Sequence, residues 1–140
     1  MTLERKLRVA ALVYLLGLAL HNADHFRRGL DATTLHVLWS GNVTTVIGVI
    51  GVVLVLTGHR YAPEAAVAFG LPIGLGVTAV HYLPDWFGPF SDSFPAQDMS
   101  WVSWAVVAVE VAGALAVGVY GLRILAVRNR EQVGARLAHQ

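Results

Sequence analysis

Two histidines and an aspartate follow the first apolar segment, at a depth where a membrane-crossing helix would still lie inside the bilayer. The run reads Leu20, His21, Asn22, Ala23, Asp24, His25. Ionisable side chains inside a membrane segment are costly, usually face a bundle interior or a wet cavity, and mark a working site by default. The spacing of His21 and His25 places the two imidazoles one helical turn apart, which suits a pair of metal ligands.

Two further ionisable residues are expected near the same depth. With Val9 at the inner edge of a ~30 Å hydrocarbon core, His21 lies about 12 Å and His25 about 6 Å below the outer edge. The same arithmetic puts His81 about 6 Å and Glu110 about 13 Å below it. We therefore expect one shared pocket in which His25 meets His81 and His21 meets Glu110.

Histidines and carboxylates gathered from three helices make a workable first shell for a divalent metal, Zn or non-haem Fe. The predicted metal ligands are His21, His25, His81 and Asp24. The predicted catalytic groups, which would handle protons, are Glu110 and Asp85. Since the chain has no cysteine, thiol redox chemistry, disulfides and Cys-ligated metals are excluded.

Two other interpretations of the same residues stay open. A haem could be held between two histidines, with His21 or His25 opposite His81. The nearby carboxylates suit a hard ion better. Alternatively, the polar groups satisfy one another and the neighbouring arginines, and fix the register of the helices without any ligand.

The composition indicates an integral membrane protein. Hydrophobic residues make up 56% and charged residues only 14% of the 140 residues, and the mean hydropathy is +0.59. At about 20 residues for each span, the chain has room for four helices with short connections. We predict an all-α, four-helix transmembrane bundle forming a single domain, 1–140.

The expected helices cover about 7–28, 33–57, 64–83 and 101–127, with a long loop at 84–100. Gly29 is the expected C-cap of the first helix, and Asp31 or Thr33 the N-cap of the second. Because Lys and Arg are enriched in short cytoplasmic segments, their distribution predicts that both termini are cytoplasmic. The expected location is the cytoplasmic (inner) membrane, with the histidines on the extracytoplasmic side.

The loop at 84–100 is too aromatic for a solvated connection, and we expect it to cover the mouth of the pocket as a lid or gate. Three residues are predicted to contact the substrate: Arg28, His36 and Trp86. Residues of this kind at a membrane surface suit a lipid-like or small hydrophobic substrate, and membrane lipid is the expected surrounding partner.

Two functions follow from these predictions. As an enzyme, the protein would use a metal to activate water or oxygen against a lipid-like substrate. As a transporter or accessory subunit of a membrane complex, it would pass a metal ion or a proton.

No acidic, basic or histidine side chain occurs along 46–56 or 111–121, which favours a one-sided site over a through-channel. Glycines on these segments offer faces for a homo-oligomer or a partner membrane subunit. Nucleic acid is not an expected partner, since the basic residues are few and dispersed.

Several strings resemble those of small four-span membrane proteins of actinobacteria. They are the runs at 21–29 and 81–86, the run at 90–92, and Glu110. This resemblance implies the four-span fold and supplies no mechanism. The ligand types also resemble those of membrane zinc hydrolases of the alkaline ceramidase kind, although four spans are too few and the serine-containing motif is missing.

Overall fold

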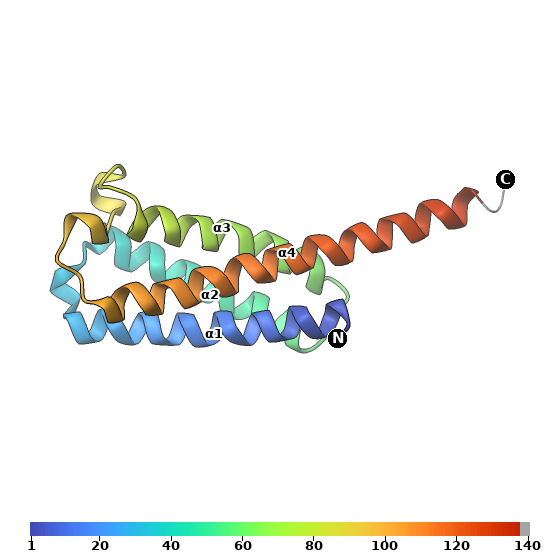
Figure 1. Ribbon diagram of the computed structural model, residues 1–140, viewed down its shortest axis with the longest axis horizontal. Helices are drawn as coiled ribbons and strands as arrows, with labels where there is room; N and C mark the ends of the chain where they lie inside the picture. The colour runs from blue at the N-terminus through green and yellow to red at the C-terminus, as the bar shows by residue number, and fades with distance from the viewer. Residues whose placement is uncertain (138–140) are drawn as a thin grey trace.

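The computed structural model describes residues 1–137, and all of its regular elements are helical. Four long helices lie side by side: α1 (Leu3–Arg28), α2 (Leu35–Leu56), α3 (Ala62–Tyr82) and α4 (Trp101–Leu137). Three short 3₁₀ helices lie in the connections: η1 (Leu30–Ala32), η2 (Gly88–Phe90) and η3 (Phe94–Ala96). At the end of the bundle that holds the N-terminus, α4 projects beyond the other helices (Figure 1).

The helix ends follow local chemistry. Thr2 caps α1 by accepting a hydrogen bond from the Arg5 backbone N–H, and Gly29 ends it with φ +89°, a conformation that glycine adopts without strain. Thr34 caps α2 by accepting from Val37 N, so the predicted cap at Asp31 or Thr33 was wrong. The reason is that η1 intervenes and the buried Thr33 hydroxyl contacts His25 instead.

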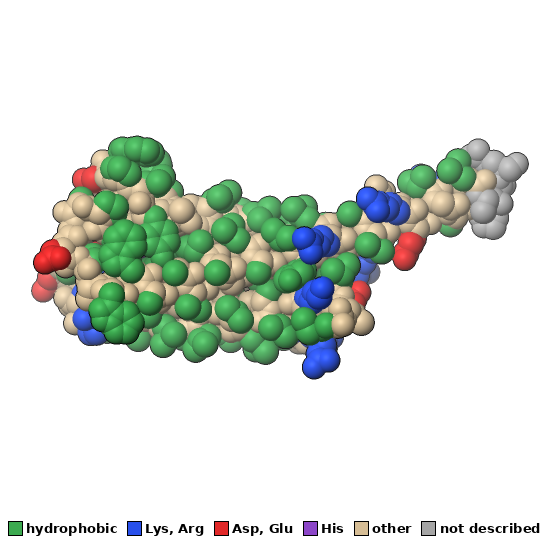
Figure 2. Space-filling model, viewed as in Figure 1, with side chains coloured by type: hydrophobic (Ala, Val, Ile, Leu, Met, Phe, Trp, Pro, Cys, Tyr) green, Lys and Arg blue, Asp and Glu red, His purple; other side chains and the backbone are tan. Residues whose placement is uncertain are grey.

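Three helices are long and apolar enough to cross a membrane: α2, α3 and α4. Apolar side chains cover the middle of the bundle, and Lys and Arg side chains on the visible face gather mainly at the end with the N-terminus (Figure 2). α1 is 26 residues long but carries charged and polar side chains at both ends. A crossing by α1, the cytoplasmic orientation of the termini and the identity of the membrane stay predictions.

α4 continues ten residues past the expected end at 127, to Leu137. The added segment is mostly polar and holds three arginines with one Glu, one Gln and one Ala, residues with good helix propensity. An apolar pattern locates the part of a helix that is buried in protein or lipid, but it does not locate the point at which the helix stops.

Glycines allow α4 to approach α1 closely. A Cβ atom on Gly113 would lie 2.5 Å from the Tyr14 backbone N and 2.6 Å from its Cα, and one on Gly17 would collide with the Glu110 backbone. Small residues at helix contacts are a common way to pack membrane helices. This close approach places Glu110 directly beside the face of α1 that carries His21.

A Gly113→Leu substitution is therefore expected to destabilise the bundle by about 1–3 kcal/mol, the usual cost of overpacking a filled interior. The measurement is the free energy of unfolding in mixed detergent micelles. Gly134→Leu is the matched control, because Gly134 lies in the projecting part of α4 and has open space around it. Equal stability of the two variants would contradict this account of the α1–α4 contact.

Candidate metal centre

Three histidine side chains converge near the end of the bundle at which α1 ends and the 83–100 connection begins; we call His21, His25 and His81 the histidine cluster. Each offers one ring nitrogen, and these nitrogens all lie within 4.8 Å of one another. The rings of His21 and His25 are 4.7 Å apart between centroids, as are those of His21 and His81. His21 and His81 are buried, and His25 is partly buried. The cluster could hold a metal ion.

Each imidazole of the cluster is oriented through its Nδ1 atom. His21 Nδ1 lies 2.5 Å from Glu110 Oε2. His25 Nδ1 lies 3.2 Å from Thr33 Oγ1. His81 Nδ1 lies 3.3 Å from the backbone oxygen of Asp92 and 3.4 Å from its Oδ2.

The Nδ1 contact of His21 leaves its second ring nitrogen without a partner. His21 Nε2 is buried and has no hydrogen-bond partner. Metal-binding histidines typically donate their other ring N–H to a carboxylate or a backbone carbonyl, which fixes the tautomer and the orientation of the ring. Glu110 and Asp92 occupy the positions of such supporting groups. An unpartnered buried nitrogen is costly, and a bound cation would satisfy it.

The 83–100 connection is tied to the end of the bundle by a buried ion pair. Nη1 and Nη2 of Arg28 each donate to an Asp92 carboxylate oxygen at 2.9 Å, and Gln97 Nε2 donates to the same group at 3.0 Å. Burial would raise the pKa of Asp92, but hydrogen bonds from His81, Arg28 and Gln97 outweigh it and hold that pKa well below its usual range. The Phe94 ring packs against His81, with centroids 4.9 Å apart.

The predicted site residues are distributed unevenly. His21, His25, His81 and Glu110 come together, whereas Asp24 lies outside the group and binds Arg27 Nε at 2.8 Å. Arg28 forms its ion pair with Asp92. Asp85 and Trp86 are exposed in the 83–100 connection and do not line the pocket described below. His36 packs against Phe90, with centroids 5.1 Å apart, beside that pocket.

Sequence reasoning missed two supporting residues, Thr33 and Asp92. Thr33 has no distinguishing local signal, because a threonine before a helix is most often a cap. Asp92 lies on a loop, whose path cannot be obtained from helical periodicity. The available clue was a basic residue at the end of α1 and acidic residues in the 84–100 loop, on the same predicted side of the membrane.

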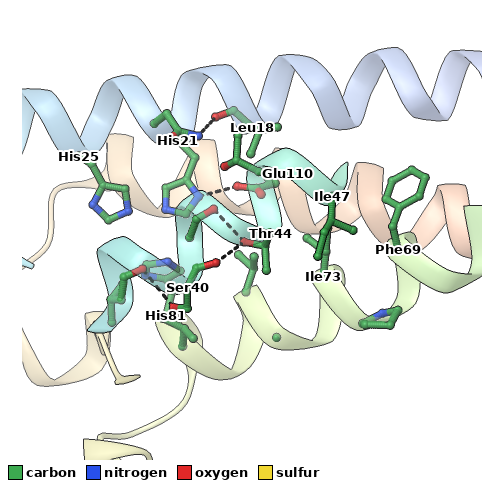
Figure 3. Close-up of a pocket in the computed structure, with 18 of the residues that line it drawn as sticks. Leu18, His21, His25, Ser40, Thr44, Ile47, Phe69, Ile73, His81 and Glu110 are labelled. Carbon is green, nitrogen blue, oxygen red and sulfur yellow. Dashed lines mark hydrogen bonds and ion pairs between the residues drawn. The ribbon is translucent and has the colours of Figure 1, made fainter. Parts of the chain in front are cut away.

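The histidine cluster lies at one end of a cavity of about 380 Å³ between α1, α2 and α3. His21, His25, His81 and Ser40 gather at one end of this pocket, while Ile47, Ile73 and Phe69 lie toward the other (Figure 3). Phe90 of the 83–100 connection also lines it. Ligand sites are commonly clefts of about 300–1,000 Å³ with mostly apolar walls and a few convergent polar groups.

Comparison of the chain with protein-family models, curated proteins and solved structures gives no match.

Proposed function

We propose that this protein is a zinc-dependent membrane enzyme that activates water against a lipid-like substrate. The observation that carries the proposal is the arrangement of the histidine cluster: one ring nitrogen of each histidine lies within 4.8 Å of the others, each Nδ1 has a partner within the protein, and His21 Nε2 is buried without one. Catalytic zinc sites typically have three protein ligands and keep a fourth position open for water or substrate.

The donor set favours zinc over iron. Non-haem iron oxygenases typically bind their metal with two histidines and one carboxylate. Here the carboxylates of Glu110 and Asp92 contact Nδ1 atoms of histidines, so they support the imidazoles from behind. Nitrogens bound to one tetrahedral zinc lie about 3.3 Å apart, so small rotations of the three rings would suffice for binding.

The spacing of the rings counts against haem. The His21 and His81 rings meet edge to face, with centroids 4.7 Å apart and planes at 80°. Imidazoles that bind one haem from opposite sides must leave room for the macrocycle between them. Rings in direct contact favour a small ion.

The histidine cluster would hold the zinc ion, which when bound would lower the pKa of its water to about 7 and so supply a nucleophile at neutral pH. The reaction class is hydrolysis, in which water gives its hydroxyl to an acyl group and its proton to the leaving group. Glu110 positions His21 through the contact at Nδ1, and the apolar pocket positions the substrate and excludes bulk water.

The proposal is tested with protein that carries a histidine-free purification tag and has been stripped with EDTA. Titration with Co²⁺ is expected to give one saturable equivalent and visible d–d bands of a four- or five-coordinate ion, and Zn²⁺ should displace the cobalt. The zinc-loaded protein should then hydrolyse p-nitrophenyl laurate faster than the stripped protein.

The matched control is His59→Ala, which removes an exposed histidine outside the cluster and should bind cobalt as the wild type does. Absence of saturable binding, or loss of the cobalt spectrum in the control, would refute the metal centre. Stoichiometric binding without hydrolysis would refute the enzymatic part.

A further inference from the structure

The pocket changes in character along its length. At the histidine cluster it is polar, and toward the middle of the bundle it is lined by apolar side chains such as Ile47, Phe69 and Ile73 (Figure 3). His81 and Phe69 are twelve residues apart on α3, which corresponds to about 18 Å along the helix axis. That length is close to half of the ~30 Å hydrocarbon core, the depth of one leaflet.

Three polar side chains that line the pocket make hydrogen bonds within the protein. Ser40 Oγ donates to the Val37 carbonyl at 3.1 Å, and Thr44 Oγ1 lies 3.0 Å from the Ser40 carbonyl. Asn22 Nδ2 donates to the Leu18 carbonyl at 2.8 Å. A ligand that passes these residues therefore needs no polar group of its own, and an uncharged apolar chain leaves none of these hydrogen bonds unmade.

Two glycines mark an opening of the pocket toward the lipid. Gly41 on α2 and Gly76 on α3 both line the cavity, both are exposed, and a Cβ on either would meet no atom within 4 Å. The neighbouring residues Ile47 and Leu75 are exposed and apolar, which is the character of a surface in contact with hydrocarbon. The pocket thus opens sideways between α2 and α3.

We propose that the pocket holds the single hydrocarbon chain of its substrate, which enters sideways from the membrane with its polar end at the histidine cluster. This inference rests on the proposed function, because the polar end is where the metal would act. A lipid of the adjacent leaflet has the same orientation, with its head at the surface and its tail toward the midplane. The volume of about 380 Å³ is near the lower end of ligand pockets, which fits one chain and excludes a second.

The test uses palmitic acid with a diazirine in the middle of its chain, added to the metal-free protein in lipid nanodiscs and photoactivated. Labelled residues are located by mass spectrometry. A chain inside the pocket labels Phe69 and Ile73, which are buried from the surrounding lipid, whereas a chain outside labels only exposed residues such as Leu75.

Gly76→Phe is designed to fill the opening, since the first side-chain atom at this position meets no protein atom within 4 Å. We expect labelling of Phe69 and Ile73 to fall about tenfold or more in this variant, equivalent to about 1.4 kcal/mol of binding. Gly41→Phe fills the opposite wall of the opening and should have the same effect. Gly134→Phe, on the projecting part of α4, should leave the labelling unchanged. Circular dichroism and thermal unfolding identify any variant that fails to fold.

Labelling confined to exposed residues, or labelling of Phe69 and Ile73 that persists in both folded pocket variants, would overturn the inference. Because the experiment needs no metal, its result is independent of cobalt binding. Labelling of the pocket without a metal centre would support the chain site and refute the proposed function. Metal binding without labelling of the pocket would refute the chain site and leave the proposed function in place.

Discussion

Replacing His81 by alanine is expected to lower the affinity for Zn²⁺ about a hundredfold or more, beyond the 10–100-fold that loss of a supporting group typically costs. His81 is one of only three imidazoles in the cluster, so its removal leaves two ligands. The affinity is measured by competition with a chromophoric chelator. Thermal unfolding gives a second readout, since an ion at 100 times its Kd stabilises the native state by about 2.7 kcal/mol.

Glu110→Gln tests a residue that orients a predicted metal ligand, whereas His81→Ala removes a predicted ligand itself. The glutamine keeps the size of the side chain but replaces the carboxylate that contacts His21 Nδ1 at 2.5 Å. We expect an intermediate loss of zinc affinity, about 10–100-fold, with the cobalt spectrum still present. The expected order of losses is therefore His81→Ala, then Glu110→Gln, with none in His59→Ala. Equal zinc affinity in His81→Ala and the wild type would show that the histidine cluster is not the metal site.

Arg28→Ala is expected to destabilise the protein by about 3–5 kcal/mol, because it leaves the Asp92 carboxylate buried without its main counter-charge. The side chains of Arg28 and Asp92 are only 7% and 2% exposed, so solvent screens the pair weakly. The measurement is the free energy of unfolding in mixed micelles at neutral pH. Arg130→Ala, which removes an exposed arginine of the projecting helix, should stay within about 0.5 kcal/mol of the wild type.

The same pair predicts an acid-sensitive stability. Since the folded-state pKa of Asp92 lies below its unfolded value, the ion pair contributes fully above that unfolded value. Its contribution falls as the pH drops from about 5 toward the lower folded pKa. Asp92→Asn should flatten this part of the pH profile. A profile as steep as that of the wild type would show that other carboxyl groups cause the acid sensitivity.

The sequence was sufficient for the parts of the fold that depend on the bilayer and on helix geometry. Apolar runs located all four long helices within a few residues at most ends, and the fixed rise of 1.5 Å per residue placed His21 level with Glu110 although 89 residues separate them. A depth calculation works here because the four helices run side by side over similar lengths, so residues at equal distances from the same end of the bundle come level.

The rotational position of side chains was less predictable. His21, Asp24 and His25 were assigned to one face of α1, yet His21 and His25 face the pocket while Asp24 binds Arg27 on α1. Consecutive residues of an α-helix point about 100° apart, so Asp24 and His25 cannot both point at one small site. Asp24 is buried beside Arg27 and does not line the pocket, whereas the partly buried His25 does.

The sequence by itself determined an all-helical, strongly apolar chain and the residues from which a metal centre can be built. Only the tertiary structure decided which nitrogen of His21 is free, that Thr33 and Asp92 support the cluster, and that a pocket with mostly apolar walls lies between α1, α2 and α3. The physical reason is that helices follow from local hydrogen bonding and burial of apolar side chains. The loop at 83–100, in contrast, takes its path from contacts distant in sequence, above all the ion pair between Arg28 and Asp92.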